Sequence, residues 1–372
     1  MTRSRTRVRH LSSVHDIGDT RVSYKECRSL AEAGYDVALI ACHDGDTTVA
    51  GIPVIGMGRP KNRIDRIFRQ TWRIFARALR EKADLYHFHD PELMGVGIAL
   101  RLCGKKVVYD VHEDVPLQIM NKTWIPGVLK RPLSLITTVV ESVAGRTLSA
   151  IVAATPSIAL KFPAAKTVVV QNFPEKDLAT ERNIKPFAER QHAFVYVGGL
   201  SAQQGLMETL KAFERLPEDQ RGIFAGKFKH LQAEAESAPG WAHVTYSGLL
   251  ARDGVVAALR DAKVGIVLDH PISNYVEGYS TKMFEYMACG LPFVASNFEL
   301  WNQIVADDEC GTTVDPFDAD AVAAALLAYL DDPEEAARVG ENGRQAILRR
   351  YNWDVEFAKL LGCYERIGVA AA

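Results

Sequence analysis

Short apolar runs alternate with helix-type patterns along this chain of 372 residues. The runs occupy residues 7–11, 36–41, 85–88, 106–109, 150–153, 167–170, 193–197, 222–225, 243–246, 264–268 and 293–295. Between them, residues 24–33, 64–82, 91–102 and 133–148 carry apolar side chains at helical spacing. Strands that alternate with helices are typical of α/β proteins with doubly wound parallel sheets. Two such domains place a ligand cleft at the carboxyl ends of their strands.

The length allows two domains, each with a core of its own. Pro186 and the charged run over residues 175–190 indicate a solvated linker. We therefore predict four segments: an N-terminal Rossmann-like domain over residues 1–175, a linker over 176–192, a C-terminal Rossmann-like domain over 193–352 and a final helix over 353–372.

Composition excludes several classes of protein. Hydrophobic residues make up 48% and charged residues 24%, a balance typical of soluble globular chains. The six cysteines form no Cys-x-x-Cys pair, which favours reduced thiols over disulfides or a structural zinc site. The basic N-terminus is not followed by the apolar core of a signal peptide, and no long apolar stretch predicts a membrane span. We expect a cytoplasmic protein.

The net charge of −2 hides an asymmetry between the two halves. Residues 1–180 carry 26 Lys and Arg against 18 Asp and Glu, whereas residues 181–372 carry 18 against 28. A basic front half favours an anionic partner. No aromatic-interleaved basic motif supports nucleic acid, so an anionic lipid surface or a lipid-phosphate acceptor fits better.

The helical segment Ile64–Lys82 carries much of this basic charge. Apolar residues such as Phe68 and Trp72 follow helical spacing on one side, and five arginines follow it on the other. One interpretation is a core-packed helix with a solvated polar face. The other is peripheral contact with an anionic membrane, at the inner face of the plasma membrane.

A second motif lies near the three-quarter point of the chain. Ser280 or Thr281 suits the N-cap of a short helix that Gly290 and Pro292 end. The start of such a helix offers unpaired N–H groups and partial positive charge to a phosphate. Glu277 before the turn and Glu285 one turn inside the helix would flank that phosphate and accept sugar hydroxyls. The alternative is a capped surface helix with two ordinary carboxylates.

The spacing from Glu277 to Glu285, with the continuation Ala288–Ser296, resembles the Glu-x7-Glu signature of family 4 retaining glycosyltransferases of group 1. The variant with Thr281-Lys282 resembles a bacterial branch that builds surface polysaccharides, and the resemblance covers nearly the whole chain. It implies a GT-B fold whose last helix crosses back to the first domain. It also implies a metal-independent hexosyltransferase without a cofactor, which moves sugar with retention from a nucleotide-diphosphate sugar to a polysaccharide or lipid-linked saccharide.

The resemblance assigns roles in the second domain. Glu285 would accept the ribose hydroxyls, and Glu277 would contact a donor-sugar hydroxyl as a catalytic-site residue. The diphosphate would lie on backbone N–H groups of Tyr279, Ser280, Thr281 and Lys282.

The chain departs from the family at the start of the second domain. Relatives place Arg and Lys on the diphosphate where this chain has Gly199 and Gln204. Because a leaving diphosphate develops negative charge, other groups must stabilise it. The candidates are Lys282, Lys227 and the backbone amides of Gly198 and Gly199. The departure also leaves open a weak or silent enzyme that only binds sugar nucleotides.

In the first domain the resemblance makes His112 the histidine near the anomeric carbon. His89 braces the site, while Asp90 and Glu113 either hold acceptor hydroxyls or lie on the surface. A metal cluster of His89, His112 and nearby His87 is the alternative that metal independence disfavours.

The polar loop after the first strand contains Gly18 and Arg21, which we expect to face the cleft. A nucleotide-sugar epimerase shares the two-domain architecture, but it needs additional acid–base residues around the sugar, and the Glu277–Glu285 pattern argues against it.

Overall fold

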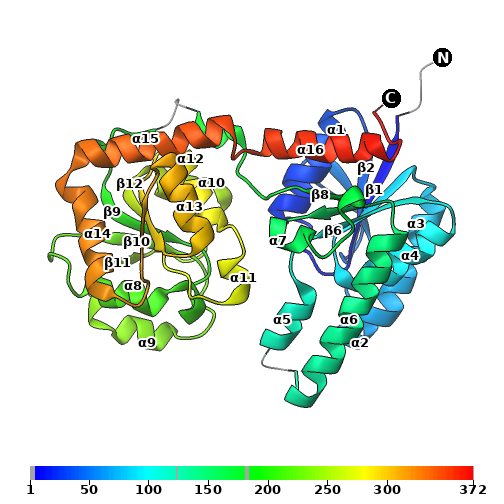
Figure 1. Ribbon diagram of the computed structural model, residues 1–372, viewed down its shortest axis with the longest axis horizontal. Helices are drawn as coiled ribbons and strands as arrows, with labels where there is room; N and C mark the ends of the chain where they lie inside the picture. The colour runs from blue at the N-terminus through cyan, green and yellow to red at the C-terminus, as the bar shows by residue number, and fades with distance from the viewer. Residues whose placement is uncertain (1–4, 123–124, 181–183, 372) are drawn as a thin grey trace. The chain divides into compact units, whose positions relative to one another are not determined.

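The computed structural model describes residues 5–122, 125–180 and 184–371. The chain forms two compact units, described separately below (Figure 1). Unit 1 contains residues 1–172 and 355–372, and unit 2 contains residues 173–354. Residues 173–180, which were predicted partly as linker, belong to unit 2, where Phe173, Leu178 and Ala179 join a hydrophobic core. Residues 181–183 of the predicted linker lie outside the described residues.

Unit 1 is built on an eight-stranded sheet in the order β3-β4-β2-β1-β5-β6-β7-β8. All described pairings are parallel except that of β3 with β4. The strands are β1 (Arg7–Ser12), β2 (Asp36–Ala41), β3 (Thr47–Val49), β4 (Ile52–Gly56), β5 (Leu85–Phe88), β6 (Lys106–Val111), β7 (Ala150–Ala153) and β8 (Thr167–Val169).

Helices connect these strands, as parallel pairing requires. They are η1 (Thr20–Cys27), α1 (Arg28–Glu32), α2 (Arg63–Asp65), η2 (Arg66–Gln70), α3 (Thr71–Glu81), η3 (Pro91–Leu93), α4 (Met94–Leu102), α5 (Val115–Asn121), α6 (Gly127–Thr147), α7 (Pro156–Ala159) and η4 (Ala164–Lys166). The central strands are buried along nearly their whole length, with Leu85, Val107 and Ile151 fully inaccessible.

The C-terminal helix α16 (Trp353–Arg366) belongs to unit 1 from Val355 onward. Its Tyr364 is buried, and the phenol oxygen lies 2.7 Å from Nδ1 of His87 in β5. Lys106 Nζ donates to the carbonyl of Gly368 at 2.6 Å. The C-terminal segment therefore packs against the sheet of unit 1, in contact with β5 and β6.

Unit 2 is built on a six-stranded parallel sheet in the order β11-β10-β9-β12-β13-β14 (Figure 1). Its strands are β9 (His192–Val197), β10 (Gly222–Ala225), β11 (Val244–Tyr246), β12 (Ala262–Val267), β13 (Phe293–Ser296) and β14 (Thr312–Val314). Its helices are η5 (Lys176–Ala179), η7 (Phe187–Glu189), η8 (Ala202–Gln204), α8 (Leu206–Phe213), α9 (Gln232–Ser237), η9 (Pro239–His243), α10 (Arg252–Arg260), α11 (Ser273–Val276), α12 (Thr281–Ala288), α13 (Glu299–Asp308), α14 (Ala319–Asp331) and α15 (Pro333–Arg349).

The predicted fold class is confirmed: both units have mainly parallel α/β sheets. Sequence reasoning missed β3, β4 and β14, because each is a short strand at or next to a sheet edge and β4 contains Pro53. It also began α6 too late, since the helix starts at Gly127 and accommodates Pro132 in its second turn.

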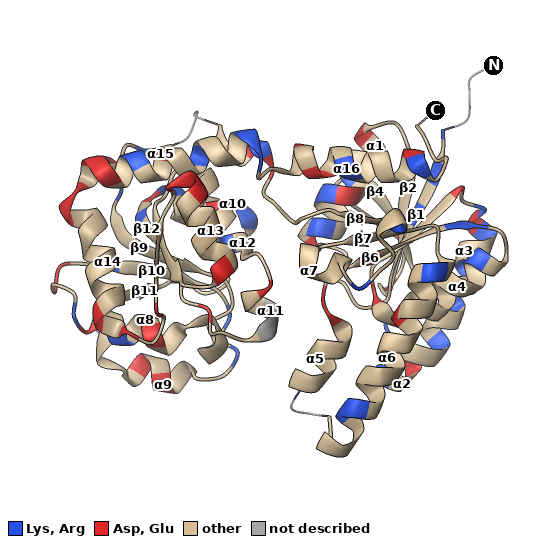
Figure 2. Ribbon diagram, in the orientation of Figure 1, with Lys and Arg blue, Asp and Glu red and all other residues tan. Residues whose placement is uncertain are grey.

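The predicted helix Ile64–Lys82 consists of α2, η2 and α3 in succession. Its buried side is formed by Gln70, Ile74 and Ala78, which are fully inaccessible. Phe68 is 72% and Trp72 68% exposed, so these large apolar side chains do not pack into the core. Arginine recurs along α3 (Figure 2), at Arg73, Arg77 and Arg80. Among the described helices, none has both the length and the apolarity to span a membrane.

Candidate functional site

Unit 2 has a cavity of about 260 Å³ at the carboxyl edge of its sheet. Gly198 directly follows β9, and Asp269 follows β12, so two adjacent strands deliver residues to it. The lining consists of Gly198, Gln204, Asp269, Tyr275, Gly278, Tyr279, Ser280, Thr281, Lys282 and Trp301. The four predicted phosphate-cradling residues thus line one cavity.

The first turn of α12 forms one wall of this cavity. Ser280 occupies the N-cap but makes no side-chain hydrogen bond to the helix, so the first N–H groups keep their capacity for an outside acceptor. Trp301 Nε1 donates to the carbonyl of Gly278 at 2.9 Å and fixes the loop before the helix. The arrangement offers an anion both N–H donors and the positive end of the helix dipole.

Lys282 is buried beneath the cavity. Its Nζ lies 2.9 Å from Asp269 Oδ1 and 5.4 Å from the ring centroid of Tyr196. One carboxylate therefore balances its charge, although an ammonium group has three donors and keeps two for other acceptors.

Lys229 is a residue that sequence reasoning missed. Leu200 pairs with the segment 227–229 as an isolated parallel bridge, so Lys227 and Lys229 project to one side and Phe228 to the other. A Cβ atom built on Gly199 would lie 3.5 Å from Lys229 Nζ and 2.6 Å from Gln204 Oε1. The exposed Lys229 therefore lies beside Gly199 and Gln204, the two positions where relatives carry a positive charge. The alternation Lys-Phe-Lys after a strand end was the available signal.

Neither of the two predicted carboxylates, Glu277 and Glu285, lines the cavity. Glu285 lies on the helix and accepts a 2.6 Å hydrogen bond from Arg252 Nη1. Glu277 is exposed in the loop between α11 and α12. Along the chain, Glu277 thus precedes α12, and Glu285 lies within the helix, where it is paired with Arg252.

Unit 1 has its own cavity of about 380 Å³, again at the carboxyl edge of the sheet. It is lined by Val14, His15, Arg66, His89, Asp90, Pro91, Glu92, Tyr109, His112, Glu113, Val115, Gln118 and Lys122. Four of the predicted residues of the first domain, His89, Asp90, His112 and Glu113, are brought together here.

His112 follows β6 and is held by Asp110 at the end of that strand. His112 Nε2 lies 2.8 Å from Asp110 Oδ2 and 3.3 Å from His89 Nδ1. Burial disfavours a charged Asp110, but Arg21 and His112 outweigh it and hold its pKa well below the usual range. A permanently ionised carboxylate therefore orients the His112 ring.

Asp90 braces the loop after β1. Its Oδ2 accepts hydrogen bonds from Ser12 Oγ at 2.8 Å and Ser13 N at 2.6 Å, and its Oδ1 lies 2.8 Å from His15 Nδ1. Burial opposes ionisation, yet His15 and the Ser13 amide lower the pKa of Asp90 to about 2. Burial also opposes protonation of His15, but Asp90 raises the His15 pKa above its usual value. His15 is a second residue that sequence reasoning missed, in a loop that it had otherwise considered.

The expectation that Arg21 faces an open cleft is wrong. The side chain is 4% exposed and donates to both carboxylate oxygens of Asp110, at 3.0 and 2.9 Å, and to the carbonyl of Val170. An arginine fork matches a carboxylate in this bidentate way, so the pair forms inside the unit. Gly18 is exposed and does not line the cavity. Its N–H donates to Asp16 Oδ1 at 2.8 Å.

Two family models match this chain. "Glycosyltransferase Family 4" matches residues 18–173, and "Glycosyl transferases group 1" matches residues 177–346. Among curated relatives, the phosphatidyl-myo-inositol mannosyltransferase of Mycobacterium tuberculosis is 24% identical over 305 residues, 78% of this chain and 75% of the relative. The MMP alpha-(1->4)-mannosyltransferase of Mycolicibacterium hassiacum is 35% identical over 123 residues, 33% of this chain and 28% of the relative. The match to the Mycolicibacterium hassiacum protein therefore spans less than a third of that relative's length.

Solved structures share the fold across nearly the whole chain. The sucrose-phosphate synthase of Thermosynechococcus elongatus has a TM-score of 0.76 at 19% identity and covers 98% of this chain and 99% of its own. The Anabaena protein HepE in complex with UDP-glucose has a TM-score of 0.73 at 15% identity and covers 97% and 99%.

Two parallel α/β units, each with a cavity at the carboxyl edge of its sheet, define a protein of the GT-B fold. The matches extend that class to a family. The chain belongs to the family 4, group 1 glycosyltransferases.

Proposed function

We propose that the protein is a retaining glycosyltransferase that moves a sugar from a nucleotide-diphosphate sugar to a polysaccharide or lipid-linked saccharide. The observation that carries this is the cavity at the start of α12, where uncapped N–H groups, the backbone of Gly198 and Gly278, and Lys282 surround space for a diphosphate. Glu285 accepts the ribose hydroxyls in place of its contact with Arg252, and Glu277 contacts the donor sugar.

The charge of the leaving diphosphate is stabilised without a metal ion or cofactor. The start of α12 contributes its dipole and Lys282 its two remaining donors. Lys229 supplies positive charge that Gly199 and Gln204 lack, because its Nζ would lie 3.5 Å from a Cβ atom built on Gly199. Lys227 projects from the same side of that segment and adds to this charge.

His112 contacts the donor sugar near its anomeric carbon. The ionised carboxylate of Asp110 fixes the orientation of the His112 ring. The acceptor attacks on the face that the diphosphate leaves, and a phosphate oxygen takes its proton. This route needs no carboxylate nucleophile, in contrast to the two carboxyl groups of glycoside hydrolysis. Glu113, in the same cavity as His112, is available to acceptor hydroxyls.

A donor panel tests this proposal. Purified protein is incubated with UDP-, GDP- and TDP-sugars and lipid-linked saccharides, and nucleoside diphosphate release is measured. GDP-mannose and UDP-glucose come first, because relatives include a GDP-mannose-dependent mannosyltransferase and a UDP-glucose complex. Proton NMR of the product then gives the anomeric configuration. Inversion would contradict the retaining mechanism, epimerised donor would indicate the epimerase, and binding without release would indicate a silent member.

We also propose that unit 1 contacts an anionic membrane through Ile64–Lys82. Ile64, Phe68 and Trp72 are 71%, 72% and 68% exposed, on a segment where arginines recur each turn. Apolar side chains beside basic ones are the composition of interfacial helices. The long helix α6 adds exposed apolar residues, among them Val128, Leu135, Ile136 and Val139.

Sedimentation with vesicles tests the membrane contact. The triple variant F68S/W72S/I64S should lose binding to phosphatidylglycerol vesicles, and R69Q/R73Q/R80Q should weaken it in a salt-dependent way. The matched control K211Q/R215Q/R221Q removes three exposed basic residues of unit 2. Equal sedimentation of all three variants would refute the proposed surface.

A further inference from the structure

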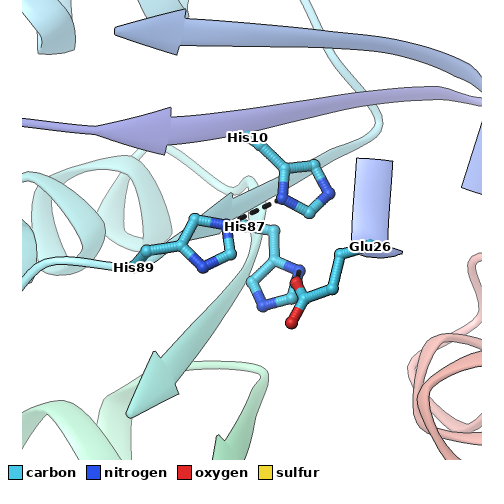
Figure 3. Close-up of side chains that lie close together, drawn as sticks. All are labelled: His10, Glu26, His87 and His89. Carbon is cyan, nitrogen blue, oxygen red and sulfur yellow. Dashed lines mark hydrogen bonds and ion pairs between the residues drawn. The ribbon is translucent and has the colours of Figure 1, made fainter. Parts of the chain in front are cut away.

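Three buried histidines meet on one face of the unit 1 sheet. β1 and β5 are neighbours, and the register places His10 directly opposite His87. His89 follows His87 by two residues, so strand alternation turns both rings to the same face. Glu26 of η1 reaches the cluster from the covering layer (Figure 3). One donor atom from each of the four side chains lies within 4.8 Å of the others.

This cluster is enclosed and incompletely satisfied. All four side chains are at most 1% exposed. Within the described part of the chain, His10 Nε2, His87 Nε2 and both carboxylate oxygens of Glu26 lack a hydrogen-bond partner. Arg21 Nε lies 3.0 Å from Glu26 Oε1, but its N–H donates to Asp110 Oδ2. Buried polar atoms are normally paired, so this concentration of unpaired donor and acceptor atoms calls for a ligand.

The charges around the cluster favour a cation. Arg21 contacts both Asp110 and Glu26, so one positive charge is shared between two carboxylates. Neutral imidazole is the form that binds metals, and an extra buried carboxylate is stabilised by a metal cation.

We propose that His10, Glu26, His87 and His89 bind one divalent first-row transition metal ion, with Zn²⁺ as the best match. Three nitrogens and one carboxylate suit such ions better than Mg²⁺ or Ca²⁺, which prefer oxygen. Four protein ligands in an enclosed site are typical of structural zinc. This departs from the prediction of no metal, and it goes beyond the proposed transfer reaction, in which the ion takes no step.

The surroundings support the assignment. His89 Nδ1 lies 3.2 Å from Asp110 Oδ2, the carboxylate–imidazole contact that orients metal-bound histidines. His10 Nδ1 and His89 Nε2 are 2.8 Å apart and share a proton. Ligands of a tetrahedral zinc ion lie roughly 3.3 Å apart, so small ring movements let the ion replace that proton.

Metal content of the full chain is the first test. Protein freed of any polyhistidine tag is stripped with a chelator, dialysed against Zn²⁺ or Co²⁺, desalted and analysed by mass spectrometry. We expect about one ion per chain, and the intense visible absorption of tetrahedral cobalt. If less than a tenth of a metal ion is retained per chain, the proposal is overturned, and His10 and His89 share only a proton. This measurement does not depend on any variant folding.

Variants then locate the ion. E26Q and H87Q should weaken binding by more than the ~10–100-fold that removal of an outer-shell partner costs. H43Q is the matched control in the same unit, and circular dichroism confirms that each variant folds. H112Q separates this cluster from the overlapping group of His89, Asp110 and His112. Loss of the ion in H112Q with retention in E26Q and H87Q would overturn the assignment.

Discussion

The two cavities of this protein are built by opposite means. The unit 1 cavity is formed by side chains that hold one another, as Asp110 holds His112 and Asp90 holds His15. The unit 2 cavity is formed largely by backbone, with glycines and the first turn of α12 at its centre. Unit 1 therefore has fixed titratable groups suited to chemistry, and unit 2 has open N–H groups suited to an anion. Substitutions in the two units should accordingly affect different quantities.

The largest effect should come from H112A. If His112 contacts the reacting sugar, removal of its ring should lower kcat about 1,000-fold, within the range for positioned polar catalytic groups. Nucleotide affinity should stay within about twofold, because the proposed diphosphate site lies in unit 2. Steady-state kinetics and calorimetry measure the two quantities. H43A is the control, and a variant H112A with near-normal kcat would remove the distinction between the units.

The next effect concerns stability. Burial raises the pKa of Glu141 in α6 to about 7, above the usual 4.5. Between these values the folded protein keeps a proton that the unfolded chain has lost, so stability falls as pH rises toward 7. E141Q should therefore stabilise the protein by about 3 kcal/mol at pH 8 and by little at pH 4. Urea unfolding at both pH values measures this.

The exposed E234Q substitution in unit 2 provides the control for Glu141. An equal gain at pH 4 and pH 8 would show that Glu141 is not a buried acid that ionises at a cost.

E285A should weaken nucleotide binding about 30-fold, or about 2 kcal/mol, which is typical of lost hydrogen bonds to a charged group. Calorimetry with a nucleoside diphosphate measures the dissociation constant. The control E214A removes an exposed carboxylate at the end of α8. Unchanged affinity in E285A would place the ribose elsewhere and weaken the proposed division of roles.

The smallest effect should come from the lysines beside Gly199. K229A and K227A should each weaken donor binding about fivefold, since an exposed charge contact contributes about 1 kcal/mol. The double variant should approach the product of the two, and added salt should reduce the difference. K211A on α8 is the control. If only K227A affects donor affinity, Lys229 does not replace the missing cation.

Local patterns predicted most of the fold. Strands β2, β5, β7 and β10 have the predicted bounds, because buried apolar runs between polar segments leave few alternatives. The turn before α12 was equally readable, since capping residues and Gly290 mark a helix by local chemistry alone. The short strands at or next to the sheet edges were missed because three to five residues carry too little apolar pattern to be distinguished from a loop.

The site was only partly predictable. Sequence spacing identified His112, His89 and the segment 279–282, which do line cavities. It could not assign Arg21, whose partner Asp110 lies 89 residues away. It also could not find Lys229, because the bridge from Leu200 to Phe228 turns that lysine toward Gly199.

The sequence by itself determined the alternation of strands and helices, the family, and the helix Thr281–Ala288 whose start we propose as a phosphate site. Those properties depend on neighbouring residues and on spacing along one element. Only the tertiary structure decided that His10, Glu26, His87 and His89 share one buried space. The reason is physical: strand register and the packing of η1 bring together side chains separated by up to 79 residues, and burial then fixes their charges.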